Sequence, residues 1–276
     1  TGAVVIPARY ETAAPFMEGG LTIVKTGEGY GLINKLGREV VPAKLQNEIK
    51  SCGCGVFAFQ QTAGFALVNS DGKRIDQGRV QEVRSHTCTQ DRLPIRQGKQ
   101  MGFIDTKGNA VTAFAYEEVF PFAHGVAPVK PLGQKYWSLI DRAGKPVGKG
   151  KYQELFPLVD GLGVGIQDNA IGENKYGVVD TAGNVVIPFQ FARISGTFEG
   201  GYVGCAAYDP YLLGSKGITP AANTWFIYNR QGQKVGETHN DIWDNFSEGL
   251  VVVEQLEKYG FADTTSKVVI PLKYDW

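Results

Sequence analysis

The chain has 276 residues, of which 43% are hydrophobic, and its 28 Lys and Arg residues balance its 28 Asp and Glu residues. A net charge near zero without a basic run argues against nucleic-acid binding, because phosphate recognition needs a clustered basic surface. No apolar run approaches the roughly 18 residues of a membrane-spanning helix, so we expect no membrane span.

One short pattern returns seven times along the chain: a bulky residue, a small residue, two apolar residues, Asn or Asp, two free positions and a turn residue. The copies begin at Tyr30, Phe65, Met101, Trp137, Tyr176, Trp225 and Tyr259. Successive turn positions lie 35, 36, 36, 39, 49 and 34 residues apart. A repeat of about 35 residues indicates an architecture built from stacked copies of one unit.

Each copy predicts a β-hairpin. Asn or Asp at the first turn position accepts a backbone N–H bond, and Gly at the fourth position tolerates a positive φ. The return strand is β-branched and ends near a proline, as in Val185–Pro188. The hairpin units are expected near residues 30–42, 65–76, 101–112, 137–148, 176–188, 225–236 and 259–271.

The segment after each hairpin carries apolar or aromatic residues at every third position, as in 116–125, 152–161 and 240–249. In the last of these, the spacing aligns Trp243 with Val119. A three-residue period fits either a 3₁₀ turn or a kinked strand. A second apolar strand follows, and no stretch shows a sustained helical period, so the sequence predicts an all-β fold.

A single unit has too little core to stand alone, so neighbouring units must bury one another's faces. The repeats run from end to end, which predicts one repeat domain over residues 1–276, cut in mid-repeat from a longer array at both ends. Seven units favour a β-propeller-like ring, which hides its edges by closure. An open β-solenoid is the alternative.

The signature resembles the WG (Trp-Gly) repeat family of bacterial proteins. Residues 176–188 and 101–111 carry the resemblance best, followed by 116–125, and it covers almost the whole chain. The namesake dipeptide is absent, because Trp137 and Trp225 are not followed by Gly. The resemblance implies a binding or scaffold module, often associated with the bacterial envelope, with no catalytic residue in its motif.

Four cysteines leave the redox compartment open. Cys52 and Cys54 lie in one loop, and His86 and Cys88 lie in the equivalent loop of the next repeat, so the four residues could converge. Three arrangements remain open: a disulfide between Cys88 and Cys52 or Cys54, unpaired thiols, or a structural zinc bound by three Cys and one His. Cys205 is expected to be buried in a strand. No other cofactor is expected.

The recurrent Asn or Asp could form a ring of carboxylates, but Asn replaces Asp in three of the seven copies. That exchange removes a charge and keeps a turn-forming side chain, so we interpret these residues as turn formers.

Two long connections are the best functional hint, because insertions on one edge of a repeat array often build a binding surface. They cover residues 167–175 and 206–224, at the same edge of neighbouring units. A neutral insertion is the alternative. The candidate binding residues in them are Asp168, Asn169, Glu173, Asn174, Tyr208, Asp209, Tyr211 and Leu212.

The common nucleotide-binding, zinc-protease and serine-hydrolase motifs are absent, and the three histidines lie in different repeats. The sequence therefore favours a non-enzymatic binding or scaffold module that recognises another protein in a bacterial envelope or secreted protein. Periplasmic or extracellular placement is favoured over cytoplasmic. The alternative is a glycan-binding or glycan-active propeller with a site in a central channel.

Overall fold

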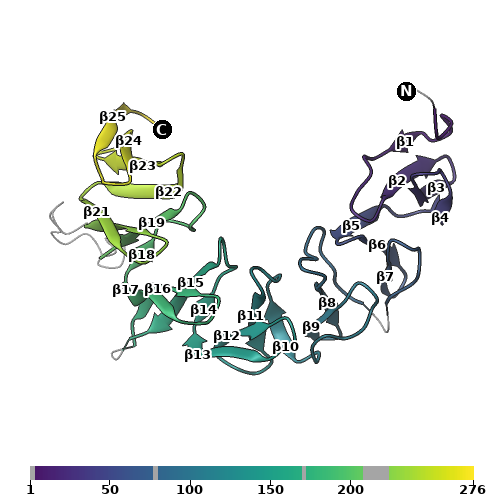
Figure 1. The fold of residues 1–276 in the computed structure, drawn as a ribbon, viewed down its shortest axis with the longest axis horizontal. Helices are drawn as coiled ribbons and strands as arrows, with labels where there is room; N and C mark the ends of the chain where they lie inside the picture. The colour runs from purple at the N-terminus through teal and green to yellow at the C-terminus, as the bar shows by residue number, and fades with distance from the viewer. Residues whose placement is uncertain (1–3, 77–79, 170–171, 208–223) are drawn as a thin grey trace. The chain divides into compact units, whose positions relative to one another are not determined.

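The structure, a computed structural model, describes residues 4–76, 80–169, 172–207 and 224–276. These residues form antiparallel strands and no helix (Figure 1). In the described ranges, therefore, no helix has the length and apolar character needed to cross a bilayer. The strands are β1 (Thr12–Ala13), β2 (Leu21–Thr26), β3 (Gly29–Asn34), β4 (Glu39–Leu45), β5 (Ile49–Gly53), β6 (Val56–Gln61), β7 (Gly64–Val68), β8 (Leu93–Gln97), β9 (Gln100–Ile104), β10 (Tyr116–Val119), β11 (Val126–Pro131), β12 (Trp137–Asp141), β13 (Pro146–Tyr152), β14 (Glu154–Leu155), β15 (Leu162–Asp168), β16 (Asn174–Asp180), β17 (Val185–Phe191), β18 (Arg193–Ile194), β19 (Tyr202–Ala206), β20 (Trp225–Asn229), β21 (Lys234–Thr238), β22 (Asp241–Ser247), β23 (Leu250–Gln255), β24 (Lys258–Asp263) and β25 (Val268–Tyr274).

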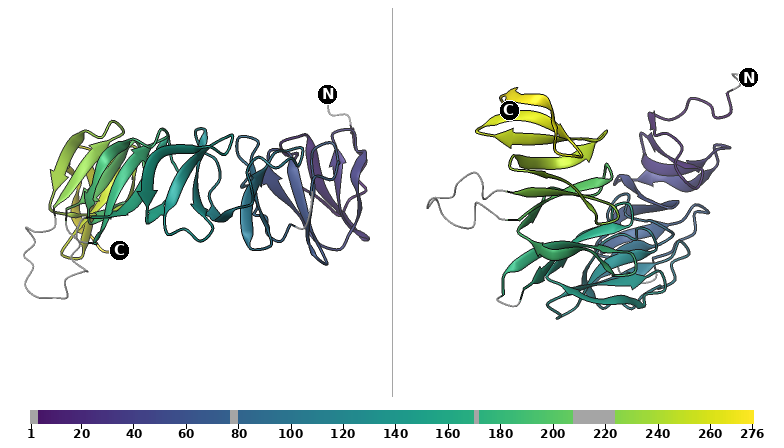
Figure 2. Two further views of the ribbon diagram at one scale, coloured as in Figure 1. Left: turned by 90° about the horizontal axis from the view of Figure 1, so that it is seen from below. Right: turned by 60° about the vertical axis from the view of Figure 1, so that its left-hand side comes forward.

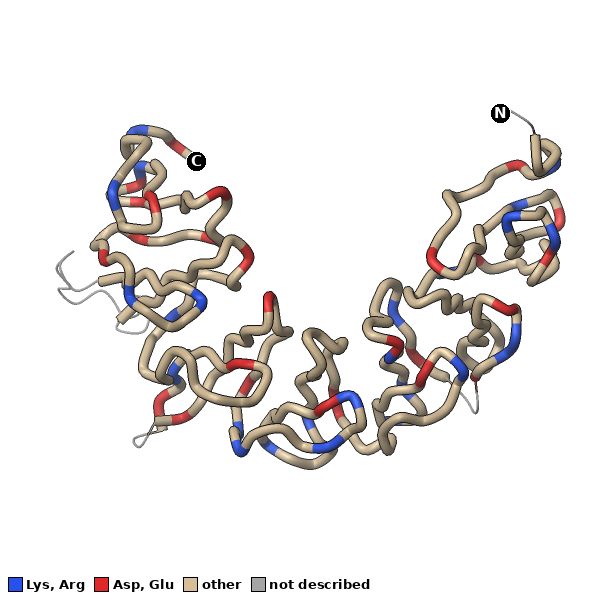
Figure 3. Tube along the Cα trace, in the orientation of Figure 1, with Lys and Arg blue, Asp and Glu red and all other residues tan. Residues whose placement is uncertain are grey.

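The chain divides into two compact units. Unit 1 comprises Thr1–Gln134 and Ile140–Lys145, and unit 2 comprises Lys135–Leu139 and Pro146–Trp276. Acidic and basic residues are interspersed along both units (Figure 3). The organisation of residues 1–276 as one domain, and the choice between a ring and an open array, stay predictions.

The repeating element is a four-stranded antiparallel sheet whose strands follow one another in sequence order. Four sheets have this order: β1 to β4 in unit 1, and β14 to β17, β18 to β21 and β22 to β25 in unit 2 (Figure 2). In the sheet of β5 to β7, bridges from Phe65 to Val80 and from Val68 to Arg74 stand in for a fourth strand. A meander of four strands is the blade of a propeller. The all-β, propeller-like fold class is confirmed.

The recurrent Asn or Asp forms the turn between the third and fourth strands of each repeat. Oδ1 of Asp180 accepts hydrogen bonds from the N–H groups of Ala182 and Asn184, both at 2.8 Å. All seven copies repeat this arrangement, with distances of 2.8–3.1 Å. Asn and Asp interchange because both supply this oxygen. The turn interpretation is confirmed.

The segment with a three-residue period forms a strand that is kinked by a bulge. In the six-stranded sheet of order β13-β12-β11-β10-β9-β8 this strand is β10, which pairs with β11 on one side and β9 on the other. The β10–β11 ladder shifts register between Tyr116 and Glu118, and the strand leads to a two-residue turn in which His124 and Gly125 have φ of 51° and 89°. Two positive φ values are typical of the tight turns that match strand twist. Of the two alternatives, the kinked strand is therefore the correct one.

The alignment of Trp243 with Val119 is wrong. The β22–β23 ladder shifts register between Trp243 and Ser247, and this bulge moves the buried position back by one residue. Ile242, which is 1% exposed, pairs with Val253 in the way that Val119 pairs with Val129. Trp243 turns to the other face of the sheet and is 40% exposed.

The core lies between successive sheets. In unit 2, Val178 and Ile187 of one sheet pack with Val203 of the next. In unit 1, Leu32 of the β1–β4 sheet packs with Phe57 of the β5–β7 sheet. Each sheet thus buries one face against its successor, as repeat stacking requires. Cys205 is fully buried in β19, as predicted.

Substitutions at two turn positions should distinguish the role of the glycine, which adopts a positive φ, from that of the Asn or Asp, which supplies an accepting oxygen. Gly108 has φ of +88°, and a Cβ there would lie 2.3 Å from the carbonyl oxygen of Ile75. Gly108→Val should therefore lower the free energy of unfolding by about 2 kcal/mol or more. Asp105→Asn keeps the accepting oxygen and should change it by less than about 0.5 kcal/mol. Urea unfolding measures both, and equal losses would contradict the turn interpretation.

The turn carboxylates should make the fold sensitive to acid. Burial favours protonation of Asp105 and Asp180, but hydrogen bonds from Asn109 and Asn184, and from backbone N–H groups, outweigh it and lower both pKa values. A folded pKa below the unfolded value of about 3.9 contributes stability above that pH, and the contribution is lost as pH falls through the folded pKa. The urea concentration at the midpoint of unfolding should therefore decrease as the pH is lowered below about 4. This decrease should be less steep in an Asp105→Asn, Asp180→Asn double variant. If the midpoints of the unchanged protein and the double variant decrease in parallel with pH, the turn carboxylates do not contribute to the acid sensitivity.

Candidate functional site

The structure joins Cys54 and Cys88 in a disulfide, with Cα atoms 5.7 Å apart. Cys52 is buried with a free thiol, and burial raises its pKa to about 12, which makes it a poor nucleophile. Across the described parts of the chain, no three His, Cys, Asp or Glu side chains gather in a way that could hold a metal ion. Of the three arrangements left open by the sequence, the structure contains the disulfide.

The disulfide connects the edges of two neighbouring sheets in unit 1. Cys54 is the first residue of the tight turn between β5 and β6, and Cys88 lies shortly before the equivalent turn of the next repeat. Backbone bonds hold the two segments together: the N–H of His86 donates to Ser51 at 3.1 Å, and that of Cys88 donates to Cys52 at 2.7 Å. These main-chain bonds explain why the spacing brings the residues together.

Polar side chains connect neighbouring sheets at this same edge in other repeats. Oε2 of Glu18 accepts from the N–H of Cys54 at 3.1 Å, and Oε1 of Gln90 accepts from the N–H of Gly125 at 3.0 Å. In unit 2, Nδ2 of Asn245 donates to Glu199 at 3.3 Å. The disulfide is therefore one of several cross-links between turns, which indicates a structural role for this edge.

The connection 167–175 is an extension of a hairpin. Asp168 pairs with Asn174 across the β15–β16 ladder. Oδ1 of Asn169 accepts from the N–H of Glu173 at 2.9 Å, and the N–H of Gly172 donates to the Asn169 carbonyl at 3.0 Å. Both bonds match bonds that the turns of the seven repeats make. The Asn169-x-x-Gly172 spacing was the sequence signal for this turn.

The charges in this connection are paired within unit 2. The carboxylate of Asp168 receives a hydrogen bond from Gln153 and lies 3.4 Å from Nζ of Lys135. The carboxylate of Glu173 lies 3.2 Å from Nζ of Lys175, and this bond is the main cause of its lowered pKa. Such surface pairs stabilise the hairpin weakly. The other candidates, Tyr208, Asp209, Tyr211 and Leu212, lie outside the described residues.

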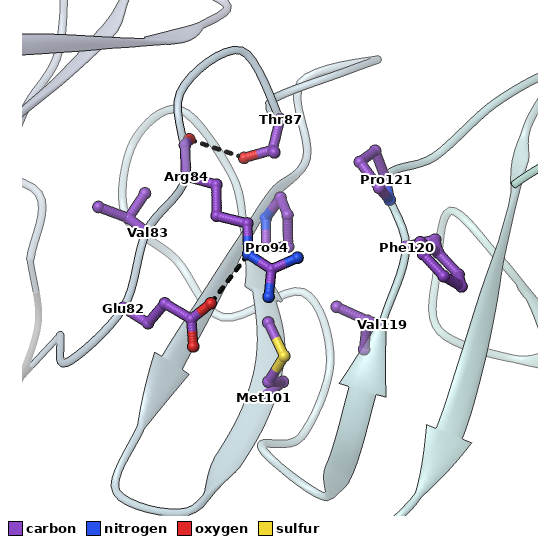
Figure 4. A pocket seen from close by; sticks show the side chains of 9 residues that line it. All are labelled: Glu82, Val83, Arg84, Thr87, Pro94, Met101, Val119, Phe120 and Pro121. Carbon is purple, nitrogen blue, oxygen red and sulfur yellow. Dashed lines mark hydrogen bonds and ion pairs between the residues drawn. The ribbon is translucent and has the colours of Figure 1, made fainter.

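A small pocket that the sequence did not reveal lies in unit 1, between residues 82–87 and β10 (Figure 4). Its cavity volume is about 30 Å³, enough for a water molecule or another small group. Met101 and Val119, each 5% exposed, form part of its apolar wall. The lining residues are Glu82, Val83, Arg84, Thr87, Pro94, Met101, Val119, Phe120 and Pro121.

The rim of the pocket is charged and held in place. Nε of Arg84 and Nε of Arg96 each lie 2.9 Å from the Glu82 carboxylate. The hydrogen bond from Arg96 is the main cause of the lowered pKa of Glu82, so this group stays ionised. Thr87 Oγ1 donates to the Arg84 carbonyl at 2.9 Å, and the Arg84 side chain is 62% exposed. Figure 4 shows this side chain extending from the loop toward the middle of the lining residues.

No motif marks this pocket, because its residues come from two repeats and pack only in the folded unit. The available signal was the Phe120-Pro121 dipeptide, which recurs as Phe156-Pro157 in the next repeat. Phe156 is 37% exposed. Aromatic side chains are enriched at protein–protein interfaces.

Stacked four-stranded sheets with a shared turn define a repeat-built, propeller-like protein. The family model described as WG containing repeat matches residues 1–29, 30–73, 101–136, 176–204 and 259–276, which is more than half of the chain. The chain therefore belongs to the WG-repeat family, as the resemblance predicted. No curated protein sequence matches it.

The chain is also similar to solved structures. The chain is similar to one described as the eukaryotic initiation factor, with a TM-score of 0.50 and 11% identity over 99% of this chain and 78% of that chain. Hsv2 of Kluyveromyces lactis has a TM-score of 0.40 and 11% identity over 94% of this chain and 96% of that chain. At this identity the likeness concerns the fold alone.

Intact mass measurement tests the disulfide. The non-reduced protein should weigh about two hydrogens less than the reduced protein, and only Cys52 and Cys205 should react with a thiol reagent after unfolding. The bond spans a sequence separation of 34, so reducing it should lower the free energy of unfolding by about 3–4 kcal/mol in the chain-entropy model. Four reactive thiols in the unfolded, non-reduced protein would contradict this assignment.

Proposed function

We propose that this chain is a non-enzymatic protein-binding module, and that the pocket between residues 82–87 and β10 receives a peptide segment of its partner. The combination of a rigid apolar pocket and an exposed guanidinium at its rim carries the proposal. The WG-repeat family and the propeller-like fold support a binding or scaffold role in general. The pocket makes that role specific.

The size of the pocket selects a small apolar group. A cavity volume of about 30 Å³ suits a small apolar group such as the methyl group of Ala, Val or Thr. Pro94, Pro121 and Phe120 form stiff walls, so little side-chain entropy is lost on binding. The partner segment would insert a methyl group and lie across the surrounding rings.

The rim adds a charge preference. Glu82 accepts a hydrogen bond from Nε of Arg84, so the outer nitrogens of this 62% exposed guanidinium are not used in that bond. A guanidinium pairs with a carboxylate in a bidentate manner. We infer that an Asp or Glu next to the small apolar residue completes the motif. The lowered pKa of Glu82 suits this fixed charge better than a general acid, which needs a raised value.

An envelope or extracellular setting is part of the same proposal. A disulfide between Cys54 and Cys88 persists in oxidising compartments and is rare in the cytosol. The cross-link lies in unit 1, the unit that contains the pocket.

A displayed library of random peptides tests the proposal. Selection on the intact chain should enrich peptides in which Asp or Glu stands next to Ala, Val or Thr. Arg84→Glu should weaken binding of the enriched peptides at least about tenfold by charge repulsion, and Phe120→Ala should weaken it about fivefold. Binding is measured by fluorescence anisotropy.

The matched control is Arg38→Glu, an exposed arginine in another turn of unit 1, which should leave binding unchanged. Circular dichroism confirms that each variant is folded. Failure to enrich any motif, or equal binding by the Arg84 and Arg38 variants, would reject the proposed function.

A further inference from the structure

The loop of residues 83–88, called the pocket loop below, forms one wall of the pocket and is longer than its counterpart in the next repeat. It stands between the bridged residues Glu82 and Thr89 and holds six residues. In the next repeat, the same interval runs from Glu118 to Ala123 and holds four residues. The pocket therefore lies beside two residues that the next repeat lacks.

The middle of the pocket loop is exposed. Arg84, Ser85 and His86 are open to solvent, and His86 has a φ of 55°, in the left-handed region that few non-glycine residues adopt. Exposed segments of this kind open locally at a lower free energy than the core does. The position of the Arg84 guanidinium therefore depends on how the ends of the loop are attached.

The C-terminal end of the pocket loop is attached to the preceding repeat. Cys88, the last residue of the loop, is 7% exposed and forms the disulfide with Cys54. Two main-chain hydrogen bonds accompany the disulfide, from His86 to Ser51 and from Cys88 to Cys52. The disulfide is the covalent member of this attachment, so its state sets how far the loop can move.

The opposite wall of the pocket is attached at the same point. Oγ1 of Thr89, the residue after Cys88, donates to the carbonyl of Phe122 at 2.6 Å. Phe122 is 2% exposed and directly follows Phe120 and Pro121, which stand across the pocket from the loop (Figure 4). Cys88 thus lies next to the junction of the two walls, where a cross-link restrains both.

We propose that the Cys54–Cys88 disulfide is a redox-sensitive clasp on the pocket. The intact bond holds the pocket loop against β5 and keeps the two walls in place, and reduction of the bond by a dithiol releases the loop. The effect on peptide binding rests on the proposed function, whereas the release of the loop needs no ligand. The site is thus complete in an oxidising compartment and loosened in a reducing one.

Reduction follows thiol–disulfide exchange. A thiolate of the dithiol attacks Sγ of Cys54, which is more exposed than Cys88, and the Cys88 sulfur leaves and takes up a proton. The second thiol of the reagent then displaces Cys54, which also takes up a proton. Two electrons and two protons pass to the protein, and the dithiol becomes a cyclic disulfide.

Limited digestion with trypsin tests the release of the loop. Trypsin needs an extended segment in its cleft, so cleavage after Arg84 reports how often the pocket loop opens. Protein that has been reduced and transferred to anaerobic buffer without reductant should be cleaved after Arg84 at least about tenfold faster than oxidised protein. Mass spectrometry of the fragments measures the rate at each site.

Cleavage after Arg38 is the matched control, because this exposed residue lies in another turn of unit 1. Its rate should be the same in both redox states. An unchanged rate after Arg84 would overturn the proposal. An equal increase at both sites would overturn it as well, since it would show that reduction unfolds the unit as a whole.

Binding of the selected peptides tests the consequence for the pocket. Reduction should weaken binding at least about fivefold in fluorescence anisotropy, and reoxidation should restore it. A Cys54→Ser, Cys88→Ala double variant should bind as weakly as the reduced protein and should not respond to the dithiol. Equal affinity of the oxidised and reduced protein would overturn the redox control.

The two measurements separate this proposal from the proposed function. If no peptide motif is enriched, the proposed function fails, and digestion alone then decides whether the disulfide holds the loop. If the double variant does not fold, the comparison of oxidised and reduced protein, each checked by circular dichroism, still decides the outcome.

Discussion

The structure depends on the burial of one apolar cross-strand row by the next sheet. A sheet of four short strands exposes both faces, and no single repeat has enough core to be stable alone. Val178, which lies in such a row, is shielded from water because Val203 of the following sheet packs against it. The other features of the chain either position this contact or strengthen it.

The turns position the contact. The Asn or Asp oxygen fixes the hairpin of the third and fourth strands, and this fixes which side chains share the row. Cross-links between the tight turns then hold adjacent sheets in register. Glu18, Gln90 and the Cys54–Cys88 disulfide perform this task with different chemistry in successive repeats of unit 1. A side chain at the turn can thus change while the geometry is kept.

These dependencies explain what the sequence could predict. The Asx turns and the β-branched return strands are local, so their spacing was sufficient to predict the hairpins and the repeat. Trp243 was misplaced because a bulge in β22 shifts the register by one residue, and sequence spacing does not record bulges. The pocket was not predicted because its lining residues are distant in the sequence. Pro94 and Val119, for example, lie on different strands and come together only in the folded unit. The second long connection stays a candidate, since Tyr208 and Tyr211 lie outside the described residues.

The same constraint locates the surfaces that are available for binding. A residue in a buried row or a turn is held by the repeat, so it contributes to stability in every copy. Arg84 belongs to neither and lies at the rim of the pocket in unit 1. The proposed recognition therefore depends on a departure from the repeat, a pocket whose lining residues come from two successive copies.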